Sequence, residues 1–213
     1  MDKREIFFDI MDNRKTNRKY SNYIPPKEDI ERIINSARLS PSAVNAQNWK
    51  FLAVYSQDIK HKMASAVLKM YDEIITKLND DEIAQNIERY RSHSTFFEQA
   101  PVVIVCVMTK SPSFLSGVLE KANYTKEEIS LMRPDSQLLS VGGAVQSMAL
   151  SAHALGLGSC WMVAPIIANK EFKQILNLDD DDKIVSLLTI GKPEDVNGRA
   201  HKKELGEIME IIE

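Results

Sequence analysis

Residues 135–160, DSQLLSVGGAVQSMALSAHALGLGSC, contribute most to defining the fold. Asp135 is a favourable helix N-cap and Gly156 can end a helix, so the stretch predicts one long helix that reaches about Leu155. Small side chains allow neighbouring elements to approach closely, so we expect this helix to be central and buried. One side of it is small, because it carries Gly142, Gly143, Ala144, Ser147 and Ala149.

Shorter segments with helical or strand character flank this helix on both sides. Apolar residues recur at helical spacing after a Pro-Pro pair, at Ile30, Ile33, Ile34 and Ala37. Further helices are predicted at residues 63–78, from residue 169 and at residues 205–212, and strands at residues 51–55, 101–108 and 184–190. Residues 79–94 are less clear and are compatible with a helix around Ile83 and Ile87.

The chain is predicted to form a single domain over residues 1–213, because no repeat and no linker divides it. Helices and strands mix without strict β-α-β alternation, which favours an α+β fold over a doubly wound parallel sheet. Residues 109–134 show no clean period and contain Pro112, Gly117 and Pro134. We expect them to form an excursion or lid rather than part of the core.

Composition limits the function classes. Of 213 residues, 44% are hydrophobic and 27% are charged, and the formal net charge is −3. This balance gives no reason to expect nucleic acid or an anionic membrane surface as a partner. The longest apolar stretch, residues 102–108, is far shorter than the ~20 residues that span a bilayer. No secretory signal is visible, and two cysteines form no disulfide framework, so we expect a cytoplasmic protein.

Two polar segments could bind a ligand. Residues 14–18, RKTNR, combine three cations with a hydroxyl and form a candidate anion-binding cradle, with a solvated basic face as the alternative. Residues 40–49, SPSAVNAQNW, place hydroxyls and amides in a turn before a strand. They could hydrogen-bond a polar ligand, or they could form a capping turn with Trp49 in the core.

A third segment, residues 154–165, follows the long helix with the sequence ALGLGSCWMVAP. Its glycines allow close backbone approach, but a Gly-x-Gly after a helix lacks the rest of the dinucleotide fingerprint. No Ser-His-Asp order, His-x-x-x-His spacing or cysteine cluster is present, so these residues offer no candidate nucleophile and predict no metal site. Cys160 either packs or lies near a ligand, and the acidic run at residues 179–182 is interpreted as a solvated loop.

Taken together and in this order, the three segments resemble the FMN-dependent nitroreductase family. The matching parts are residues 14–18, the Pro-Ser-x-x-Asn-x-Gln-x-Trp turn at residues 41–49, and the helix and Leu-Gly-Leu-Gly turn at residues 142–160. Residues 188–193, LTIGKP, resemble the family's late strand and Gly-x-Pro ending. The sequence departs from the family around Ser140 and Ser147, because members often carry an Asp near the first position and an Asn near the second.

The resemblance implies a homodimeric α+β sandwich, with a central, mainly antiparallel sheet flanked by helices and FMN at the dimer interface. Phosphate and ribityl contacts would come from Arg14, Lys15, Thr16 and Arg18. The partner chain would supply Pro41, Ser42 and Ala43, with Asn45 and Gln47 supporting the turn or touching FMN. The flavin ring would be lined by Trp161, Met162, Val163 and Ala164. A basic residue of the tail would also reach the phosphate, with Arg199 and Lys202 as the candidates.

The implied activity is a ping-pong cycle in which NADH or NADPH reduces FMN and an electrophilic small-molecule acceptor then takes the hydride. A nitroaromatic compound or a quinone would be such an acceptor, and FMN rather than a side chain would carry the chemistry. Two alternatives remain open. One is a flavin-binding carrier or sensor without turnover. The other is a relative that performs dehalogenation or oxygen-dependent oxidation, since the excursion is where substrate selection varies in this family.

Overall fold

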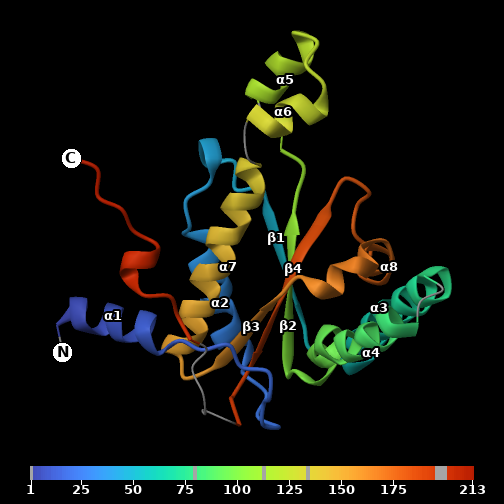
Figure 1. Ribbon diagram of the computed structural model, residues 1–213. Helices are drawn as coiled ribbons and strands as arrows, with labels where there is room; N and C mark the ends of the chain where they lie inside the picture. Colours follow the sequence, from blue (N-terminus) through green and yellow to red (C-terminus); the bar gives the residue numbers. More distant parts are fainter. Residues whose placement is uncertain (1, 79–80, 112–113, 133–134, 195–200) are drawn as a thin grey trace.

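A four-stranded antiparallel sheet forms the centre of the computed structural model, which describes residues 2–78, 81–111, 114–132, 135–194 and 201–213 (Figure 1). Its strands lie in the order β1 (Trp49–Val54), β2 (Val102–Met108), β4 (Lys183–Gly191) and β3 (Gly158–Met162). Every neighbouring pair is antiparallel. The predicted α+β class and the strands predicted at residues 51–55, 101–108 and 184–190 are therefore confirmed.

Helices cover both faces of the sheet. Helix α2 (Lys27–Arg38) and helix α7 (Ser136–Ala154) pack on one face, where they meet Ile104 and Cys106 of β2. Helix α3 (Gln57–Leu78) and helix α8 (Asn169–Ile175) cover the other face, above Val103 and Val105. All residues of β2 are buried, because this central strand carries apolar side chains toward both layers.

Helix α7 begins and ends as its sequence predicts. The Asp135 carboxylate accepts hydrogen bonds from the backbone N–H groups of Gln137 and Leu138, both at 3.0 Å. Gly156 has a φ of 73°, the left-handed conformation that lets the chain leave the helix. The expectation of a buried helix holds for the side that meets α2 and the sheet, whereas Leu139 and Gly143 are exposed.

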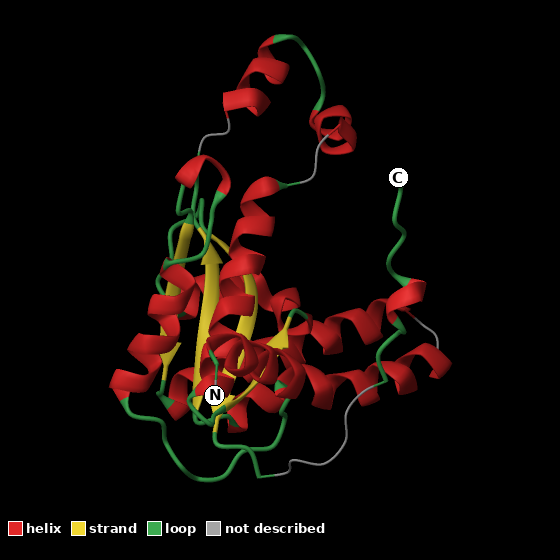
Figure 2. Cartoon of the chain, turned by 90° about the vertical axis from the view of Figure 1, so that its left-hand side faces the viewer, coloured by secondary structure: helices red, strands yellow, loops and turns green. Residues whose placement is uncertain are grey.

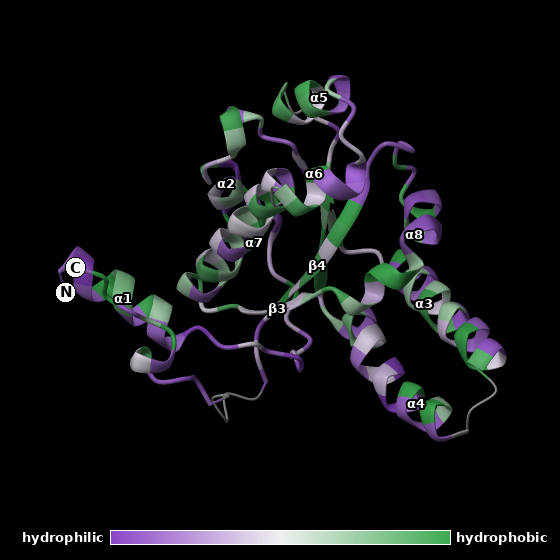
Figure 3. Ribbon diagram, turned by 45° about the horizontal axis from the view of Figure 1, so that its top comes forward, coloured by the Kyte–Doolittle hydropathy of each residue, from purple (hydrophilic) through white to green (hydrophobic). Residues whose placement is uncertain are grey.

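The excursion at residues 109–134 contains two short helices that the sequence pattern does not predict. Helix α5 (Phe114–Lys121) and helix α6 (Lys126–Met132) extend beyond one end of the sheet, away from both layers (Figures 1 and 2). Helix α1 (Lys3–Asn13) also projects from the body and has no buried residue (Figure 1). Apolar residues are visible on α1 and α5 in the hydropathy view (Figure 3).

The remaining elements connect these layers. Helix α4 (Asp81–Thr95) lies beside α3 and confirms the helix considered around Ile83 and Ile87. Three short 3-10 turns follow the residues Ser42, Thr95 and Val163: η1 (Ala43–Asn45), η2 (Phe96–Gln99) and η3 (Ala164–Ala168). No helix in the described part of the chain combines the length and apolar character needed to cross a membrane.

The terminal helix predicted at residues 205–212 is wrong. Only the 3-10 turn η4 (Leu205–Glu207) forms there, and the residues after it have no regular structure. All residues of this tail from 201 to 213 are exposed. A short amphipathic segment gains little from helix formation without a surface to pack on, because most helical stability comes from tertiary packing.

Candidate functional site

The basic segment at residues 14–18 lies along the start of β3. The backbone N–H of Asn17 donates to the carbonyl oxygen of Ser159 at 2.8 Å, and Thr16 and Ser159 form a parallel bridge. This approach requires a glycine at position 158, because a Cβ there would lie 2.7 Å from Asn17 Oδ1 and 2.9 Å from Asn17 Cβ. The Gly-rich turn after α7 therefore positions the basic segment.

Tyr20 fixes the end of the same segment. Its hydroxyl donates to the carbonyl oxygen of Asn17 at 2.6 Å and lies 2.6 Å from Thr189 Oγ1. Burial raises the pKa of Tyr20, so its phenol stays protonated. Gly191 allows the ring to approach, because a Cβ there would lie 2.8 Å from Tyr20 Cγ. Sequence reasoning missed Tyr20, and its role is visible only in the contact with β4.

A cavity of about 690 Å³ opens beside this segment and brings several predicted residues together. Arg18 forms part of its wall, and the residues at the end of β3 and after it form another part. Trp161 is 44% exposed, so its ring is available to a ligand in this space. The predicted residues that line the cavity are Arg18, Trp161, Met162, Val163 and Ala164. Cys160, for which packing and a place near the ligand were both left open, lines it too, and the lining residues that the sequence did not predict are Tyr90, His93 and Phe96.

Lys15 lines a second, smaller depression of about 320 Å³, together with Asn17 and His153. The basic segment thus presents Lys15 and Arg18 to different spaces. Arg14, the first residue of the basic segment, is also the C-cap of α1, and its backbone N–H donates to the Ile10 carbonyl oxygen at 3.1 Å. Lys202 is exposed in the tail, and Arg199 lies outside the described residues.

The turn that begins at residue 40 packs against α7 through two serines. Ser140 Oγ accepts a hydrogen bond from the Ala43 N–H at 3.1 Å, and Ser147 Oγ lies 2.8 Å from Ser40 Oγ. The two positions at which the sequence departs from the family therefore do make polar contacts. Within the turn, the Gln47 N–H donates to Ser42 Oγ at 3.0 Å.

The same turn has an unusual backbone. Val44, Asn45 and Gln47 have φ values of 52°, 54° and 46°, a conformation that costs energy in residues other than glycine. The turn lies near the N-terminal end of α7, whereas residues 14–18 lie near the opposite end (Figure 1). One chain alone does not bring these two predicted parts of the site together.

The cysteines are buried. Burial raises the pKa of the Cys106 thiol to about 12 and also raises the pKa of Cys160, although the Arg18 charge opposes the second shift. Neither environment favours a reactive thiolate. In the acidic run, Asp181 pairs with Lys110 at 2.8 Å, and across the described residues no group of His, Cys, Asp or Glu is arranged to hold a metal ion.

The residues present suit FMN chemically. Arginine and lysine side chains of the basic segment can pair with a phosphate, and the neighbouring cavity has an apolar wall suited to a flat ring. The backbone after β3 carries further hydrogen-bonding groups beside that wall. A site with these features, at the edge of an α+β sheet, suits a phosphorylated aromatic cofactor.

Comparison with known proteins gives the family. The nitroreductase family model matches residues 11–192, so this chain belongs to the nitroreductase family. It is 24% identical over 213 residues to MhqN of Bacillus subtilis (strain 168), whose name describes an NAD(P)H nitroreductase; the match covers 95% of this chain and 97% of that protein. It is also 30% identical over 153 residues to an iodotyrosine deiodinase of Haliscomenobacter hydrossis, over 71% of this chain and 64% of that protein.

A solved structure agrees closely with the whole fold. The crystal structure of a BluB-like flavoprotein from Clostridium difficile 630 superposes with a TM-score of 0.88 at 27% identity, over 97% of this chain and 99% of that one. A structure of iodotyrosine deiodinase bound to FMN and 3-iodo-L-tyrosine superposes with a TM-score of 0.68 at 22% identity, over 93% of this chain and 95% of that one. The predicted nitroreductase-like fold is therefore confirmed.

Proposed function

We propose that this protein is an FMN-dependent oxidoreductase that uses NADH or NADPH to reduce an electrophilic small molecule. The observation that carries the proposal is the cavity shared by Arg18 and the segment from Trp161 to Ala164, next to the basic segment at residues 14–18. Flavin-binding relatives in the same family, and the name of MhqN, support the choice of cofactor and of reductant.

The chain's own residues would bind and orient the reactants. Arg14, Lys15 and Thr16 would hold the phosphate and ribityl chain, while Arg18 would reach the pyrimidine edge of the ring. When bound, FMN would supply the hydride chemistry, by which two electrons and one proton of NAD(P)H would reach the acceptor and leave NAD(P)⁺. A second proton comes from solvent, so a quinone becomes a hydroquinone, or a nitro group becomes a nitroso group and water.

Bound flavin can be tested directly on the purified protein. We expect a yellow protein that releases FMN on denaturation, or a colourless one that becomes yellow and binds FMN stoichiometrically when the cofactor is added. A protein that remains colourless after incubation with excess FMN would contradict the proposal.

We propose in addition that the working form is a homodimer with one FMN at each of two shared sites. The separation of the turn at residues 41–47 from the basic segment within one chain supports this arrangement. Exposed apolar side chains on three elements also support it, because water-exposed clusters of this kind often mark interfaces. These side chains are Ile6, Phe7, Phe8 and Met11 of α1, Leu139 of α7, and Leu205, Ile208, Met209, Ile211 and Ile212 of the tail.

Subunit mixing tests the shared site. An Arg14→Ala chain and an Ala43→Arg chain should each bind FMN poorly as homodimers. In the mixed dimer, one site would combine the intact Arg14 of one chain with the intact Ala43 of the other. We therefore expect refolded mixtures to recover up to one FMN per mixed dimer, whereas no recovery, or a monomer in sedimentation experiments, would contradict the shared site.

Dehalogenation is a second candidate reaction. The similarity to an iodotyrosine deiodinase over 71% of this chain favours it, and the proposed lid at residues 109–134 would then select a halogenated phenol. Anaerobically reduced protein can be mixed with p-benzoquinone, nitrofurazone or 3-iodotyrosine. Fast flavin reoxidation by the quinone or nitro compound supports the first reaction, whereas reoxidation by 3-iodotyrosine with iodide release supports the second.

A further inference from the structure

One face of α4 and the turn after it form a wall of the candidate flavin cavity. Tyr90 and His93 of α4 and Phe96 of η2 line the same space as Arg18 and Trp161. They recur every three residues, so they follow one side of the chain as α4 passes into η2. None of the sequence segments that resemble the family contains these residues.

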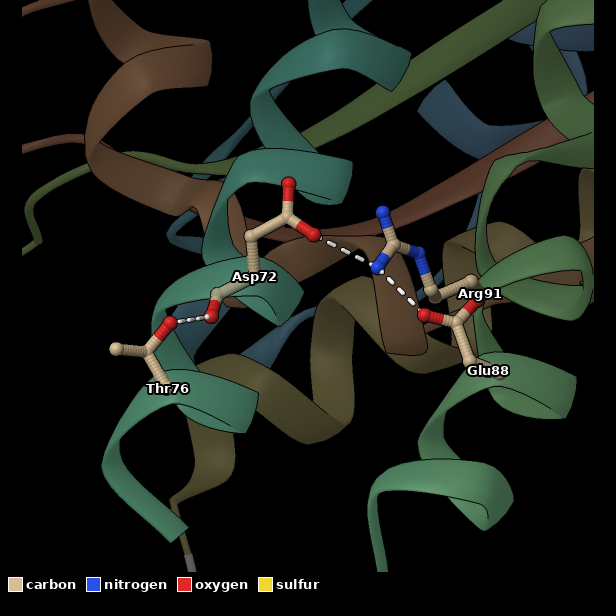
Figure 4. A network of polar contacts seen from close by, with 4 residues as sticks. All are labelled: Asp72, Thr76, Glu88 and Arg91. Atoms are coloured by element: carbon tan, nitrogen blue, oxygen red, sulfur yellow. Dashed lines mark hydrogen bonds and ion pairs between the residues drawn. The ribbon is translucent and has the colours of Figure 1, made fainter. Parts of the chain in front are cut away.

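Polar contacts hold α4 against α3 and so fix this wall. Arg91 Nη1 pairs with Asp72 Oδ1 of α3 at 2.7 Å and with Glu88 Oε1 of α4 at 2.9 Å (Figure 4). The Arg91 side chain is 19% exposed, whereas the Asp72 and Glu88 side chains are 61% and 60% exposed, so this pairing orients α4 on α3 but remains screened by water. Further along α4, Ser94 Oγ lies 2.8 Å from the Tyr71 hydroxyl in a buried contact.

The charge of the cavity favours an electron-rich ring. Among the described residues that line it, the side chains able to carry positive charge are Arg18 and His93, and there is no carboxylate. An imidazole provides an N–H donor whether it is neutral or protonated. A flavin that accepts a hydride carries added negative charge on its pyrimidine ring, and groups near that ring tune its electronics.

We propose that His93 is a second group, besides Arg18, that stabilises the reduced flavin relative to the oxidised flavin and so raises its reduction potential. The inference rests on the proposed FMN site and adds a residue to it. With His93 removed, the oxidised cofactor keeps its phosphate contacts, whereas the reduced cofactor loses a donor. We therefore expect the substitution to change the ratio between the affinities for reduced and oxidised FMN, and not to weaken both affinities equally.

The test compares His93→Leu with His93→Lys in the FMN-loaded protein. The measurements are the dissociation constant of oxidised FMN, by fluorescence titration, and the midpoint potential, by equilibrium with a reference dye. We expect His93→Leu to change the affinity for oxidised FMN by no more than about twofold, and to lower the affinity for reduced FMN by a further three- to tenfold. That difference corresponds to a midpoint potential lower by about 15–30 mV for a two-electron couple. His93→Lys should keep the potential at or above that of the parent protein.

His61→Leu is the matched control, because His61 lies on α3 and pairs with Glu98 at 2.7 Å, outside the lining of this cavity. It should not change the potential. Equal potentials in the parent protein and His93→Leu, or equal shifts in His93→Leu and His93→Lys, would overturn this inference while leaving the FMN proposal intact. Failure of the parent protein to bind FMN would overturn both.

Discussion

Ser140 on α7 accepts a hydrogen bond from the backbone N–H of Ala43, with 3.1 Å between the two heavy atoms. Ser140 Oγ also donates to the Ser136 carbonyl oxygen at 2.7 Å, so the hydroxyl joins the helix to the turn through both of its functions. The contact ties one part of the candidate site to the first half of α7.

Ser140→Ala should loosen the turn at residues 41–47. The substitution leaves the Ala43 N–H without its acceptor, and loss of one such hydrogen bond lowers the free energy of unfolding by about 1 kcal/mol. Urea denaturation measures the change, and limited proteolysis reports cleavage within the turn. Ser92→Ala is the control, because the exposed Ser92 hydroxyl donates to the Arg89 carbonyl of its own helix. Equal losses in the two variants would contradict the role of Ser140.

Gly158→Ala should displace the basic segment. Its new Cβ would meet three atoms of the Asn17 side chain at 2.7–2.9 Å, and something must move to relieve that contact. We expect FMN affinity to fall by about tenfold or more, because the proposed phosphate-binding residues Arg14, Lys15 and Thr16 directly precede Asn17 and would move with it. Gly117→Ala on α5 has no heavy atom within 4 Å of the added Cβ and serves as the control. Unchanged FMN affinity in Gly158→Ala would show that the segment's placement does not matter for binding.

Arg14→Ala should weaken FMN binding through the loss of a charge-assisted contact with the phosphate. Such a hydrogen bond contributes roughly 1.5–3 kcal/mol, which corresponds to about a ten- to hundredfold higher dissociation constant. Arg38→Ala removes a similar charge from α2, where Arg38 Nε donates to Asn35 Oδ1 at 2.8 Å, and should leave binding unchanged. If the Arg14 variant binds as tightly as the parent protein, the phosphate lies elsewhere.

Stability should fall at high pH because of Cys106. Burial raises the pKa of its thiol from 9.0 to about 12, so above pH 9 the unfolded chain releases a proton that the folded chain retains. The stabilisation is complete below pH 9 and is lost between pH 9 and pH 12, with a slope of at most about 1.4 kcal/mol per pH unit. Urea denaturation of Cys106→Ala between pH 9 and pH 10.5 should show a shallower decline than the parent protein. Parallel curves would contradict the assignment.

Local sequence signals predict the helices that carry their own capping residues and the strands that are strongly apolar. Helix α7 has its own N-cap in Asp135 and its own stop in Gly156, and strand β2 is buried on both faces. Strand β3 was missed because Gly-Ser-Cys-Trp-Met resembles a turn. It becomes a strand through pairing with β4, in which Cys160 lies opposite Thr189.

The parts of the candidate site that lie in short continuous motifs were predictable from the sequence, whereas the parts that depend on packing between distant segments were not. The segments around Arg18 and Trp161 were identified from short motifs, and the fold brings these two residues to one cavity. Tyr20 reaches this region through its contact with Thr189 of β4. His93 reaches it because α4 packs on α3. The pattern at residues 205–212 predicted a helix because amphipathic spacing carries no information about whether a packing surface exists.

Anaerobic mixing of the FMN-loaded protein with NADH, and separately with NADPH, tests the central claim most directly. The account predicts that at least one of the two bleaches the flavin absorbance near 450 nm, and that p-benzoquinone then restores it within the same sample. Bleaching by neither nucleotide, with FMN still bound, would contradict an NAD(P)H-dependent oxidoreductase and would favour a flavin-binding protein without turnover.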